Sequence, residues 1–322
     1  MEYDFNNLNL ENCSMRMGNI KDVNDILDLI NLVQPKNPWS YEYLMWQYFS
    51  SYGHANLYLI TNNDKIVSLY ASIKKKIYVN GKTKDAFMIQ DVITHPDFRG
   101  RGFLNYLGKL CVDDIINSKS FAYVFPNKLS ENSFRRNGWM ELTKIPLRTK
   151  EIIFDDKNFK TSEIFENRIE QFDDVSTEIW NNSGLNIGLH RDNLFLNWRY
   201  SRPSTKYFKF YLKNDKGFFI LKMFENNNQK KLHILDLVVC KTARNLIMDT
   251  LQFIQQFAVV HSVNMITCWL SKYHPYSDVF DKFGLLLDTN LDRFAFVINP
   301  ENEQEFSDIT RWHLTQGDSD VY

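Results

Sequence analysis

The residues best suited to chemistry lie between positions 91 and 102, in the segment DVITHPDFRGRG. Gly100 and Gly102 bracket Arg101, and Arg99 adds a second positive charge. The apolar, β-branched run before this turn predicts a strand that ends at the proline, because proline cannot donate to a sheet ladder. A helix is predicted after the turn, because apolar residues recur there at helical spacing: Phe103, Leu104, Leu107, Leu110, Cys111, Ile115 and Ile116.

A strand, a glycine turn and a helix in this order favour binding of a phosphorylated ligand. Backbone N–H groups then point outward at the positive end of the helix dipole, and glycine lets the backbone approach an anion closely. The segment contains neither GxxxxGK[ST] nor a GxGxxG followed by an acidic residue about twenty positions later. An ordinary strand-to-helix turn is the alternative interpretation.

The turn resembles motif A of the GCN5-related acyltransferases, the GNAT superfamily, whose pattern is R/Q-x-x-G-x-G/A. Arg99 takes the first position and Gly102 the fourth, whereas Leu104 stands where the family usually has Gly or Ala. A later stretch is similar to the family's N-x-x-A-x-x-F-Y-x-x-x-G-F, through Asn127, Ser130, Phe134, Gly138 and Trp139. Phe134 replaces a Tyr that often serves as general acid, so the resemblance leaves the acid unassigned.

The resemblance implies transfer of an acyl group, expected to be acetyl, from coenzyme A to the amine of a small molecule such as an amino sugar, without a metal. The strand Gln90 to Thr94 is expected to separate from its neighbour so that its backbone pairs with the pantetheine arm. A backbone N–H near Ile93 is expected to face the thioester oxygen. The expected coenzyme A contacts are Val92, Ile93, Thr94, Arg99, Gly100, Arg101, Gly102, Phe103, Leu104, Asn127 and Phe134.

Asp91 is the leading candidate for the general base, because it lies on that strand just before the turn. The alternative is a structural role, since a carboxylate within an apolar run is often hydrogen-bonded in place. Tyr106, Tyr123 and Ser133 are candidates for the general acid, and water is a further one.

The segment Trp312 to Tyr322, WHLTQGDSDVY, bears on the same site. The resemblance implies that the chain end of a two-domain relative can return to the first domain's active site. Asp318 and Asp320 would then bind a cationic amine or act as the base. A frayed acidic tail is the alternative, although the aromatic residues Trp312 and Tyr322 favour a docked one.

The second half of the chain repeats the first. SYEYLMWQYF (Ser40 to Phe49) aligns without a gap with DNLFLNWRYS (Asp192 to Ser201), and IQDVIT aligns with ILDLVV, which pairs Asp91 with Asp236. Where the first copy has HPDFRGRGF, the second has CKTARNLIM (Cys240 to Met248), which contains no glycine. Cofactor binding is therefore assigned to the N-terminal copy.

The order of helical and strand patterns predicts an α+β (mixed αβ) fold with two tandem GNAT-like domains. Each is expected to be a mostly antiparallel twisted sheet flanked by helices. The predicted divisions are an acyl-CoA-binding domain at 1–153, a linker at 154–162, and a degenerate domain with a C-terminal tail at 163–322.

Composition narrows the class of protein. The chain has 322 residues, a net charge of −1 and 44% hydrophobic residues, which argues against a disordered chain and a general nucleic-acid binder. The four cysteines lack metal-ligand or CxxC spacing, no signal peptide is visible, and no apolar run would span a bilayer. We therefore expect a cytoplasmic protein with free thiols and no membrane or nucleic-acid partner. A homodimer is compatible with the sequence.

Two other functions fit the same patterns. The absence of the family's Tyr at Phe134 is compatible with a non-catalytic sensor of acyl-CoA or an acylated metabolite. An aminoacyl transferase that acts on peptidoglycan precursors also pairs two such domains, but those enzymes do not need the Arg-Gly-Arg-Gly turn.

Overall fold

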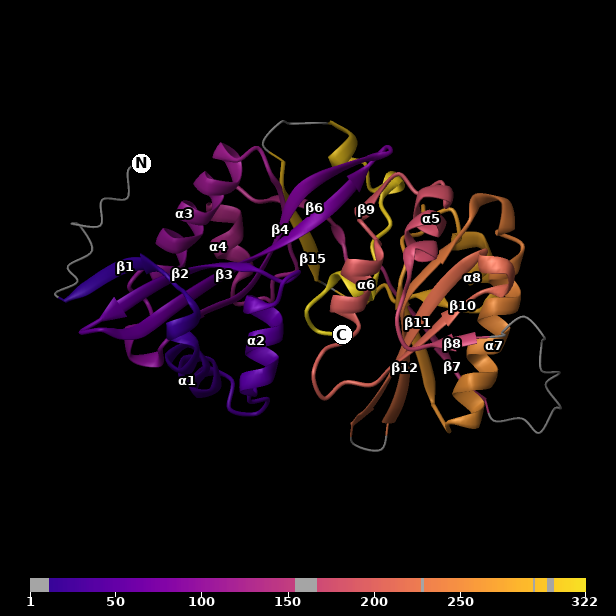
Figure 1. Ribbon diagram of the computed structural model, residues 1–322, viewed down its shortest axis with the longest axis horizontal. Coiled ribbons are helices and arrows are strands. Elements are labelled where there is room, and N and C mark those ends of the chain that lie inside the picture. The colour runs from indigo at the N-terminus through magenta and orange to yellow at the C-terminus, as the bar shows by residue number, and fades with distance from the viewer. Residues whose placement is uncertain (1–11, 154–166, 227–228, 292, 300–303) are drawn as a thin grey trace. The chain divides into compact units, whose positions relative to one another are not determined.

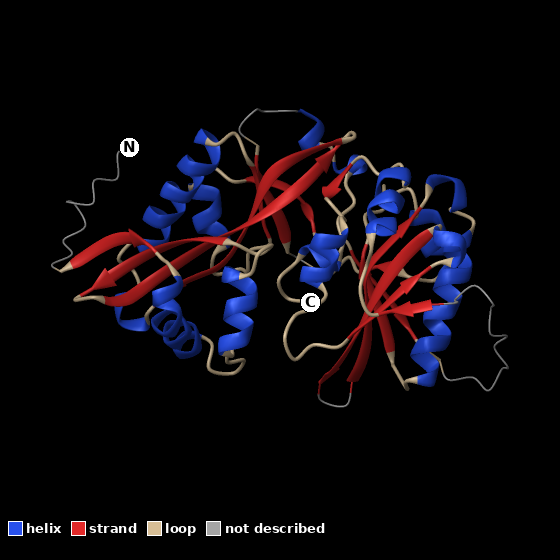
Figure 2. Cartoon of the chain, viewed as in Figure 1, coloured by secondary structure: helices blue, strands red, loops and turns tan. Residues whose placement is uncertain are grey.

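The computed structural model describes residues 12–153, 167–226, 229–291, 293–299 and 304–322 (Figure 1). The chain divides into two units. The first comprises Met1–Ile77, Lys84–Leu142 and Arg293–Glu303, and the second comprises Tyr78–Thr83, Thr143–Asp292 and Gln304–Tyr322. Each unit is built on a mixed sheet with helices packed on it, which confirms the predicted α+β class (Figure 2).

The first sheet has the strand order β1-β2-β3-β4-β5-β15-β6. Its strands are β1 (Cys13–Met17), β2 (Ala55–Asn62), β3 (Lys65–Val79), β4 (Lys82–Thr94), β5 (Phe121–Val124), β6 (Met140–Lys144) and β15 (Phe294–Ile298). Helices α1 (Val23–Val33) and α2 (Tyr41–Phe49) share a buried cluster with Leu57, Leu59 and Leu69. Helices α3 (Phe103–Asn117) and α4 (Glu131–Arg136) share another with Tyr58, Ile60 and Tyr70. Because strand neighbours point to opposite faces, each helix pair covers one face of the sheet.

The second sheet has the order β14-β7-β13-β12-β11-β10-β8. Its strands are β7 (Leu147–Glu151), β8 (Asn167–Ile169), β10 (Tyr207–Tyr211), β11 (Gly217–Asn226), β12 (Gln229–Val239), β13 (Met265–Trp269) and β14 (Leu286–Leu287). The helices are α5 (Asp174–Asn182), α6 (Asn193–Arg199), α7 (Leu246–Val260) and α8 (Ser277–Phe283), and the short β9 (Ile187–Leu189) pairs with β3. Phe253 and Phe257 of α7 contact Phe208, Phe210 and Phe219 and so cover one face.

The two halves exchange one strand. β15, from the C-terminal half, lies between β5 and β6 in the first sheet, and β7, from the N-terminal half, lies between β13 and β14 in the second. Arg148 of β7 is fully buried and donates to Asp281 and Ser277 of α8, at 2.5 and 2.7 Å. In the first sheet, Arg135 of α4 lies over the ring of Phe296 of β15.

This exchange corrects the predicted domain boundaries. A division into 1–153 and 163–322 assigns β7 to the first domain and β15 to the second, whereas each strand belongs to the other sheet. Period and composition identify a strand, but they do not say which sheet it joins, and this is why the sequence pattern missed the exchange. The predicted linker at 154–162 lies outside the described residues.

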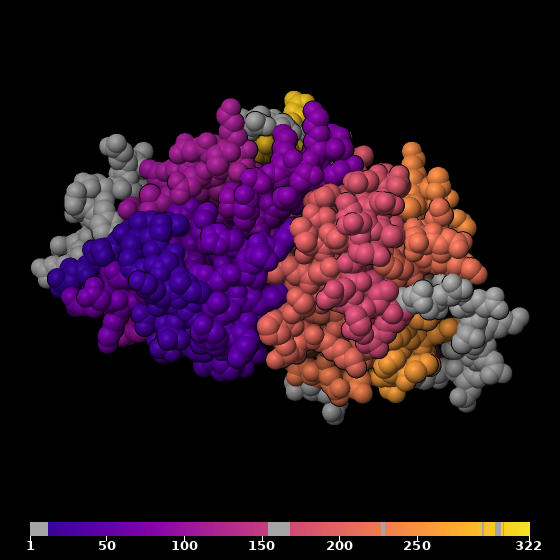
Figure 3. Space-filling model, in the orientation of Figure 1, coloured from indigo at the N-terminus to yellow at the C-terminus, as the bar shows by residue number. Residues whose placement is uncertain are grey.

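The predicted repeat is visible in local structure. Helix α2 begins after Ser40, whose hydroxyl accepts from the Tyr43 N–H, and α6 begins after Asp192, whose carboxylate accepts from the Phe195 N–H. In the space-filling view, indigo residues of the first unit and pink residues of the second are visible at the surface (Figure 3).

Within the described ranges, we find no helix that has both the length and the apolar character needed to cross a bilayer.

Candidate functional site

The site begins where β4 leaves its neighbour β5. The two strands pair in parallel only from Ala86–Phe121 to Met88–Tyr123, although β4 continues to Thr94. Asp91 interrupts the strand with a φ of +48°, a left-handed conformation that a non-glycine residue rarely adopts. The pairing with β5 ends at Met88, so Gln90 to Thr94 lie beyond the part of β4 that pairs with β5, in agreement with the predicted separation.

The turn after β4 presents a row of backbone donors. Gly100 and Gly102 have φ values of +78° and +81°, and Gly102 caps α3 in the left-handed region. The first hydrogen bond of α3 runs from the Tyr106 N–H to the Gly102 carbonyl at 3.0 Å. Among the described residues, no group accepts from the N–H groups between Gly100 and Asn105. The start of α3 therefore has the geometry of an anion-binding site.

These donors line a groove of about 930 Å³, which we call the basic groove. Its walls are formed by Val33, Gln34, Val92, Ile93, Thr94, Phe98, Arg99, Gly100, Arg101, Gly102, Phe103, Leu104, Asn105, Asn127, Leu129, Ser130, Asn132, Ser133 and Arg136. Three of these residues are arginines and none is acidic, so the charge of the groove matches a polyanionic ligand. A side chain added at Gly100 would meet no atom within 4 Å, and this turn therefore uses glycine for its backbone conformation rather than for lack of space.

Ten of the eleven predicted coenzyme A contacts line this groove. The exception is Phe134, which is 3% exposed and packs edge-to-face against Trp139 at 5.4 Å. Helix α4 turns Phe134 toward the core, and its neighbour Ser133 faces the groove instead, donating to the Asn105 amide oxygen at 2.6 Å. The expected contact of Phe134 with coenzyme A is therefore not supported by its place in the core, and it stays a prediction.

Sequence reasoning missed several groove residues. Asn105 lies three residues after Gly102, so helical spacing would have indicated it, whereas Asn132 and Arg136 stand two residues from Phe134 and therefore on another face of α4. Val33 and Gln34, at the end of α1, carried no such signal, because only the packing of α1 brings them to the groove.

Asp91 is held by neutral donors from two elements. The Tyr48 hydroxyl of α2 donates to its carboxylate at 2.6 Å, and the Gln90 side-chain amide donates at 2.7 Å. Burial and the Asp91 charge raise the pKa of Tyr48 well above its ordinary value, so this phenol stays protonated as a donor. Asp91 itself is half-buried and does not line the basic groove. Asp91 thus makes the structural hydrogen bonds that one interpretation of the sequence expected. Its position is also compatible with the role of general base.

The other predicted catalytic residues lie elsewhere. Tyr106 packs against the core cluster of α3 and is not among the groove residues. Asp318 is 4% exposed inside the second unit, where it pairs with Arg191 at 2.7 Å and accepts from the Thr315 N–H at 2.7 Å. Asp320 follows it, and its carbonyl accepts from Arg202 of the same unit. A buried arginine of the second unit therefore holds Asp318, and its expected return to the first active site stays a prediction.

The C-terminal segment is docked, as its aromatic residues predicted. Tyr322 lies edge-on to His233 and Trp269, at 4.9 and 5.5 Å, and Arg199 donates to the carbonyls of Gly317 and Ser319. The frayed tail is therefore wrong, and residues 312–322 form part of the second unit.

The equivalent turn of the second unit is closed. Arg244 and Asn245 have right-handed helical φ values, and α7 begins at Leu246 without a left-handed turn. The Arg244 guanidinium reaches the Ser183 carbonyl at 3.5 Å, and Lys241 lies against Gly184. Side chains thus bridge the end of α5 and the turn, whereas the equivalent elements of the first unit, α1 and the glycine turn, line an open groove.

Residues 14–141, about two fifths of the chain, match the family model described as an acetyltransferase (GNAT) domain. The matched range contains β4, the glycine turn and α3. This confirms the resemblance drawn from motif A. Among the curated proteins, none matches this sequence.

Solved structures show the same fold over most of the chain. An Enterococcus faecalis protein described as a probable N-acyltransferase is 13% identical with a TM-score of 0.68, over 92% of this chain and 74% of that one. A GCN5-related N-acetyltransferase from Anabaena variabilis is 13% identical with a TM-score of 0.63, over 89% and 73%. Saccharomyces cerevisiae N-myristoyltransferase with bound myristoyl-CoA is 11% identical with a TM-score of 0.57, over 90% and 83%.

Proposed function

We propose that this protein transfers an acetyl group from acetyl-CoA to the amine of a small molecule, such as an amino sugar, and that the first unit alone binds the coenzyme. The observation that carries this proposal is the row of unpaired N–H groups after Gly100, set in a groove that contains three arginines and no acid. The myristoyl-CoA bound to the yeast neighbour supports an acyl-CoA ligand in this fold.

The two ends of the basic groove suit the two ends of the coenzyme. The N–H groups at the start of α3, with Arg99 and Arg101, would hold the diphosphate. The unpaired edge of β4 at Val92 to Thr94 would pair with the pantetheine amides, and a backbone N–H near Ile93 would donate to the thioester oxygen. Such a fixed donor stabilises the negative charge that develops on this oxygen in the transition state.

The thioester supplies the acyl group, so the C–S bond breaks as the acceptor nitrogen forms the new C–N bond. For this attack the acceptor ammonium must first lose a proton, and Asp91 would take it directly or through water. The hydrogen bonds from Tyr48 and Gln90 fix the carboxylate in place. As the C–S bond breaks, the nitrogen, now bonded to carbon, loses its second proton, and water carries a proton to the leaving thiolate, so the products are the neutral amide and the free thiol of coenzyme A.

Calorimetric titration with acetyl-CoA tests the site. We expect saturable binding by the natural protein and none by Gly102→Val, because valine cannot adopt the φ of +81° without strain that closes the turn. Asn245→Val, in the helical turn of the second unit, is the matched control and should bind normally. Equal affinity of Gly102→Val and the natural protein would contradict the assignment.

Thiol release measured against a panel of amines then tests turnover. Acetylation of at least one amino sugar or other small amine is expected, and it should fall at least tenfold in Asp91→Asn. Binding of acetyl-CoA without turnover of any amine would favour the sensor instead.

A further inference from the structure

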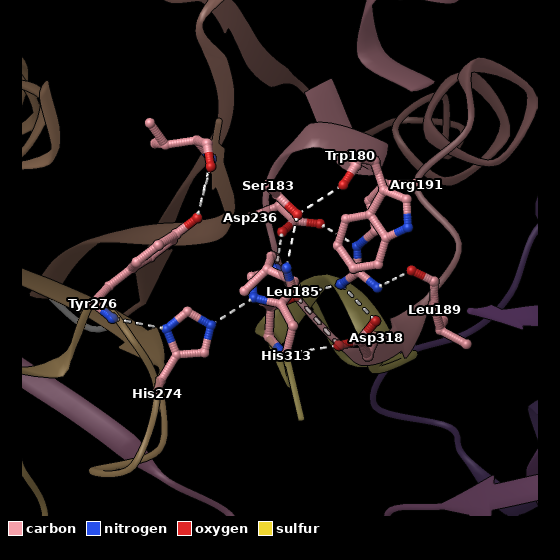
Figure 4. Close-up of polar contacts among 12 residues, drawn as sticks. Trp180, Ser183, Leu185, Leu189, Arg191, Asp236, His274, Tyr276, His313 and Asp318 are labelled. Carbon is pink, nitrogen blue, oxygen red and sulfur yellow. Dashed lines mark hydrogen bonds and ion pairs between the residues drawn. The ribbon is translucent and has the colours of Figure 1, made fainter. Parts of the chain in front are cut away.

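Two histidines lie buried against each other in the second unit. His274, which follows β13, is 4% exposed, and His313, which belongs to the C-terminal segment, is 1% exposed. Nε2 of His274 lies 3.0 Å from Nδ1 of His313, and Nε2 of His313 lies 3.0 Å from the Asp236 carboxylate (Figure 4). The histidine pair thus joins the C-terminal segment to β12 and to the loop after β13.

The hydrogen bonds determine which nitrogen of each ring carries a hydrogen. Nδ1 of His274 accepts from the Tyr276 backbone N–H at 3.2 Å, so the hydrogen of a neutral His274 lies on Nε2 (Figure 4). Nδ1 of His313 accepts this hydrogen bond, so the hydrogen of a neutral His313 also lies on Nε2, and the Asp236 carboxylate accepts from it. Both nitrogens of each ring therefore have a partner while the rings are neutral.

An added proton would disrupt this chain of hydrogen bonds. On His274 the proton would lie on Nδ1 and face the Tyr276 N–H, and on His313 it would lie on Nδ1 and face the His274 N–H. If the hydrogen of His274 moved to Nδ1 so that its Nε2 accepted from a charged His313, the Tyr276 N–H would again face a donor. In each of these arrangements two donors would meet at 3.0 to 3.2 Å.

The surroundings of His274 also oppose a charge on it. Burial, followed by repulsion from a charged His313 and from Arg244 and Arg148, holds the pKa of His274 well below its ordinary value. Arg148 comes from β7 and Arg244 from the turn before α7, so cations face the ring from two elements. The geometry and the charges therefore both favour a neutral ring.

The carboxylate in contact with the pair is shared with a cation of the same unit. The Arg191 guanidinium donates to Asp236 at 2.9 Å and pairs with Asp318 at 2.7 Å (Figure 4). The charge of Asp236 is thus balanced while His313 is neutral. The titratable and charged groups that face the pair and this carboxylate are Arg148, Arg191, Arg244, Tyr200, Tyr276, Asp236 and Asp318.

The C-terminal segment is also attached by groups that do not titrate. The His313 backbone N–H donates to the Ile187 carbonyl at 2.7 Å, and the Gln316 side-chain amide donates to the Thr267 hydroxyl at 3.2 Å. Amide, hydroxyl and carbonyl groups keep their protonation state between pH 5 and pH 7. These contacts therefore do not respond to mild acid, whereas the histidine pair does.

We propose that the His274–His313 pair is a pH-sensitive switch for the attachment of the C-terminal segment. The neutral pair holds residues 312–322 on the second unit, and uptake of protons in mild acid releases them. Release is local, because the phenylalanine side chains that join α7 to the sheet do not titrate. This inference goes beyond the proposed function and does not depend on it.

Hydrogen exchange of backbone amides at pH 7 and pH 5, corrected for the intrinsic rate at each pH, measures the opening of the segment. The reporter is the His313 N–H, which is bonded to the Ile187 carbonyl. A histidine that regains its ordinary pKa of about 6.5 on opening favours the open state roughly twentyfold at pH 5 relative to pH 7. We therefore expect the protection of this amide to fall at least tenfold, and that of the α7 amides by no more than about threefold.

His274→Gln tests whether the pair causes this change. A glutamine side chain can turn either its oxygen or its nitrogen toward His313, so it accommodates the neutral and the charged ring alike. The change in protection between the two pH values should therefore shrink to less than about threefold. His261→Gln is the matched control, because His261 bonds only to the Phe257 carbonyl at the end of α7, and it should behave as the natural protein does.

Three results would overturn the inference. The first is equal protection of the His313 amide at both pH values, or an equal fall in His274→Gln and the natural protein. The second is a pH dependence that His233→Gln removes instead, since His233 contacts Tyr322 of the same segment. The third is a parallel loss of protection in α7, which would mean that the whole unit opens.

Nitrogen NMR of the natural protein provides a test that needs no substitution. At pH 7 both rings should be neutral and carry their hydrogen on Nε2, with a hydrogen bond between the two rings. A hydrogen on Nδ1 of either ring at pH 7 would contradict the switch, even if His274→Gln did not fold.

Discussion

The strand–turn–helix units β4–α3 and β12–α7 share a framework and differ in one turn. Both strands carry an aspartate, both are followed by a single 3-10 turn, and both helices run for 15 residues. The first helix begins after two glycines with positive φ, whereas the second begins directly from residues in helical conformation. The turn before α7, which lacks the two glycines, therefore does not present the backbone N–H groups that the turn before α3 presents, although the strand and the helix are alike.

The two units also differ at the point where the longer strand, β4 or β12, extends beyond its parallel neighbour. β12 and β13 pair from Lys231–Met265 only to Ile234–Cys268, so this sheet is splayed as well. In the second unit the C-terminal segment takes this space, with Gln316 donating to Thr267 and Gly317 lying against the Leu235 carbonyl. In both units the parallel pairing thus ends before the longer strand does, and in the second unit the C-terminal segment covers the part of β12 beyond it.

Separating the chain into two fragments should have the largest effect on stability and on acetyl-CoA binding. A fragment of residues 1–153 lacks β15, which leaves β5 and β6 without the strand that joins them. We expect this fragment to show no cooperative thermal unfolding and no acetyl-CoA binding. Co-expression with residues 163–322 should restore both, and a fragment that binds acetyl-CoA by itself would show that the exchange is dispensable.

Arg191→Met should destabilise the second unit by about 3–5 kcal/mol, because it leaves the buried Asp236 and Asp318 without their shared cation. Chemical denaturation measures this loss. Arg202→Met is the control, since that side chain is partly exposed and donates to the Asp320 carbonyl at 3.2 Å, and it should cost less than about 1 kcal/mol. Similar losses in the two variants would mean that the buried network contributes little.

Mild acid should also weaken the second unit more than the first. Burial, followed by the charges of Lys222 and Lys231, lowers the pKa of His233 to about 3, and burial lowers that of His274 well below its ordinary value. Below about pH 6.5 these histidines take up protons in the unfolded chain but not in the folded protein. The free energy of unfolding therefore decreases as the pH is lowered. The loss at pH 5 should be about 2 kcal/mol from His233, and His274 should add a loss in the same direction.

Denaturation at pH 7 and pH 5 checks this dependence. His233→Gln should lose less stability than the natural protein between the two pH values. An identical loss in both proteins would count against a neutral, buried His233.

The smallest expected effect is a change in acetyl-CoA affinity caused by one substitution in the basic groove. Arg101→Ala removes one charged contact to the diphosphate and should weaken acetyl-CoA binding by about tenfold, less at high salt. Arg244→Ala, in the closed turn, should leave the affinity unchanged. An effect of Arg244→Ala as large as that of Arg101→Ala would place a ligand in the second unit.

Local features of the fold could be predicted from the sequence, because they depend on neighbouring residues. The glycine turn, the cap at Ser40 and the repeated carboxylate at Asp236 each follow from residue type and spacing. The direction of Phe134 could not be predicted, because the family pattern gives a position and not the face of a one-and-a-half-turn helix.

Contacts between segments far apart in the sequence could not be predicted either. Nothing near Arg148 in the sequence indicates a fully buried guanidinium, since its partners Ser277 and Asp281 lie in the other half of the chain. The binding of Asp318 by Arg191 is of the same kind. In each case a charge is buried only because a segment more than a hundred residues away covers it.

The exchanged strands also constrain how the protein is made. About 170 residues separate β5 from β15, so a ribosome adding 5–20 residues per second needs roughly 10 to 30 seconds to deliver the strand that completes the first sheet. Throughout that interval the nascent first half lacks the strand that lies between β5 and β6, so the edges of these two strands are exposed. Synthesis of the second half is therefore a condition for the first to reach its native state, and chaperones have a defined window in which to act.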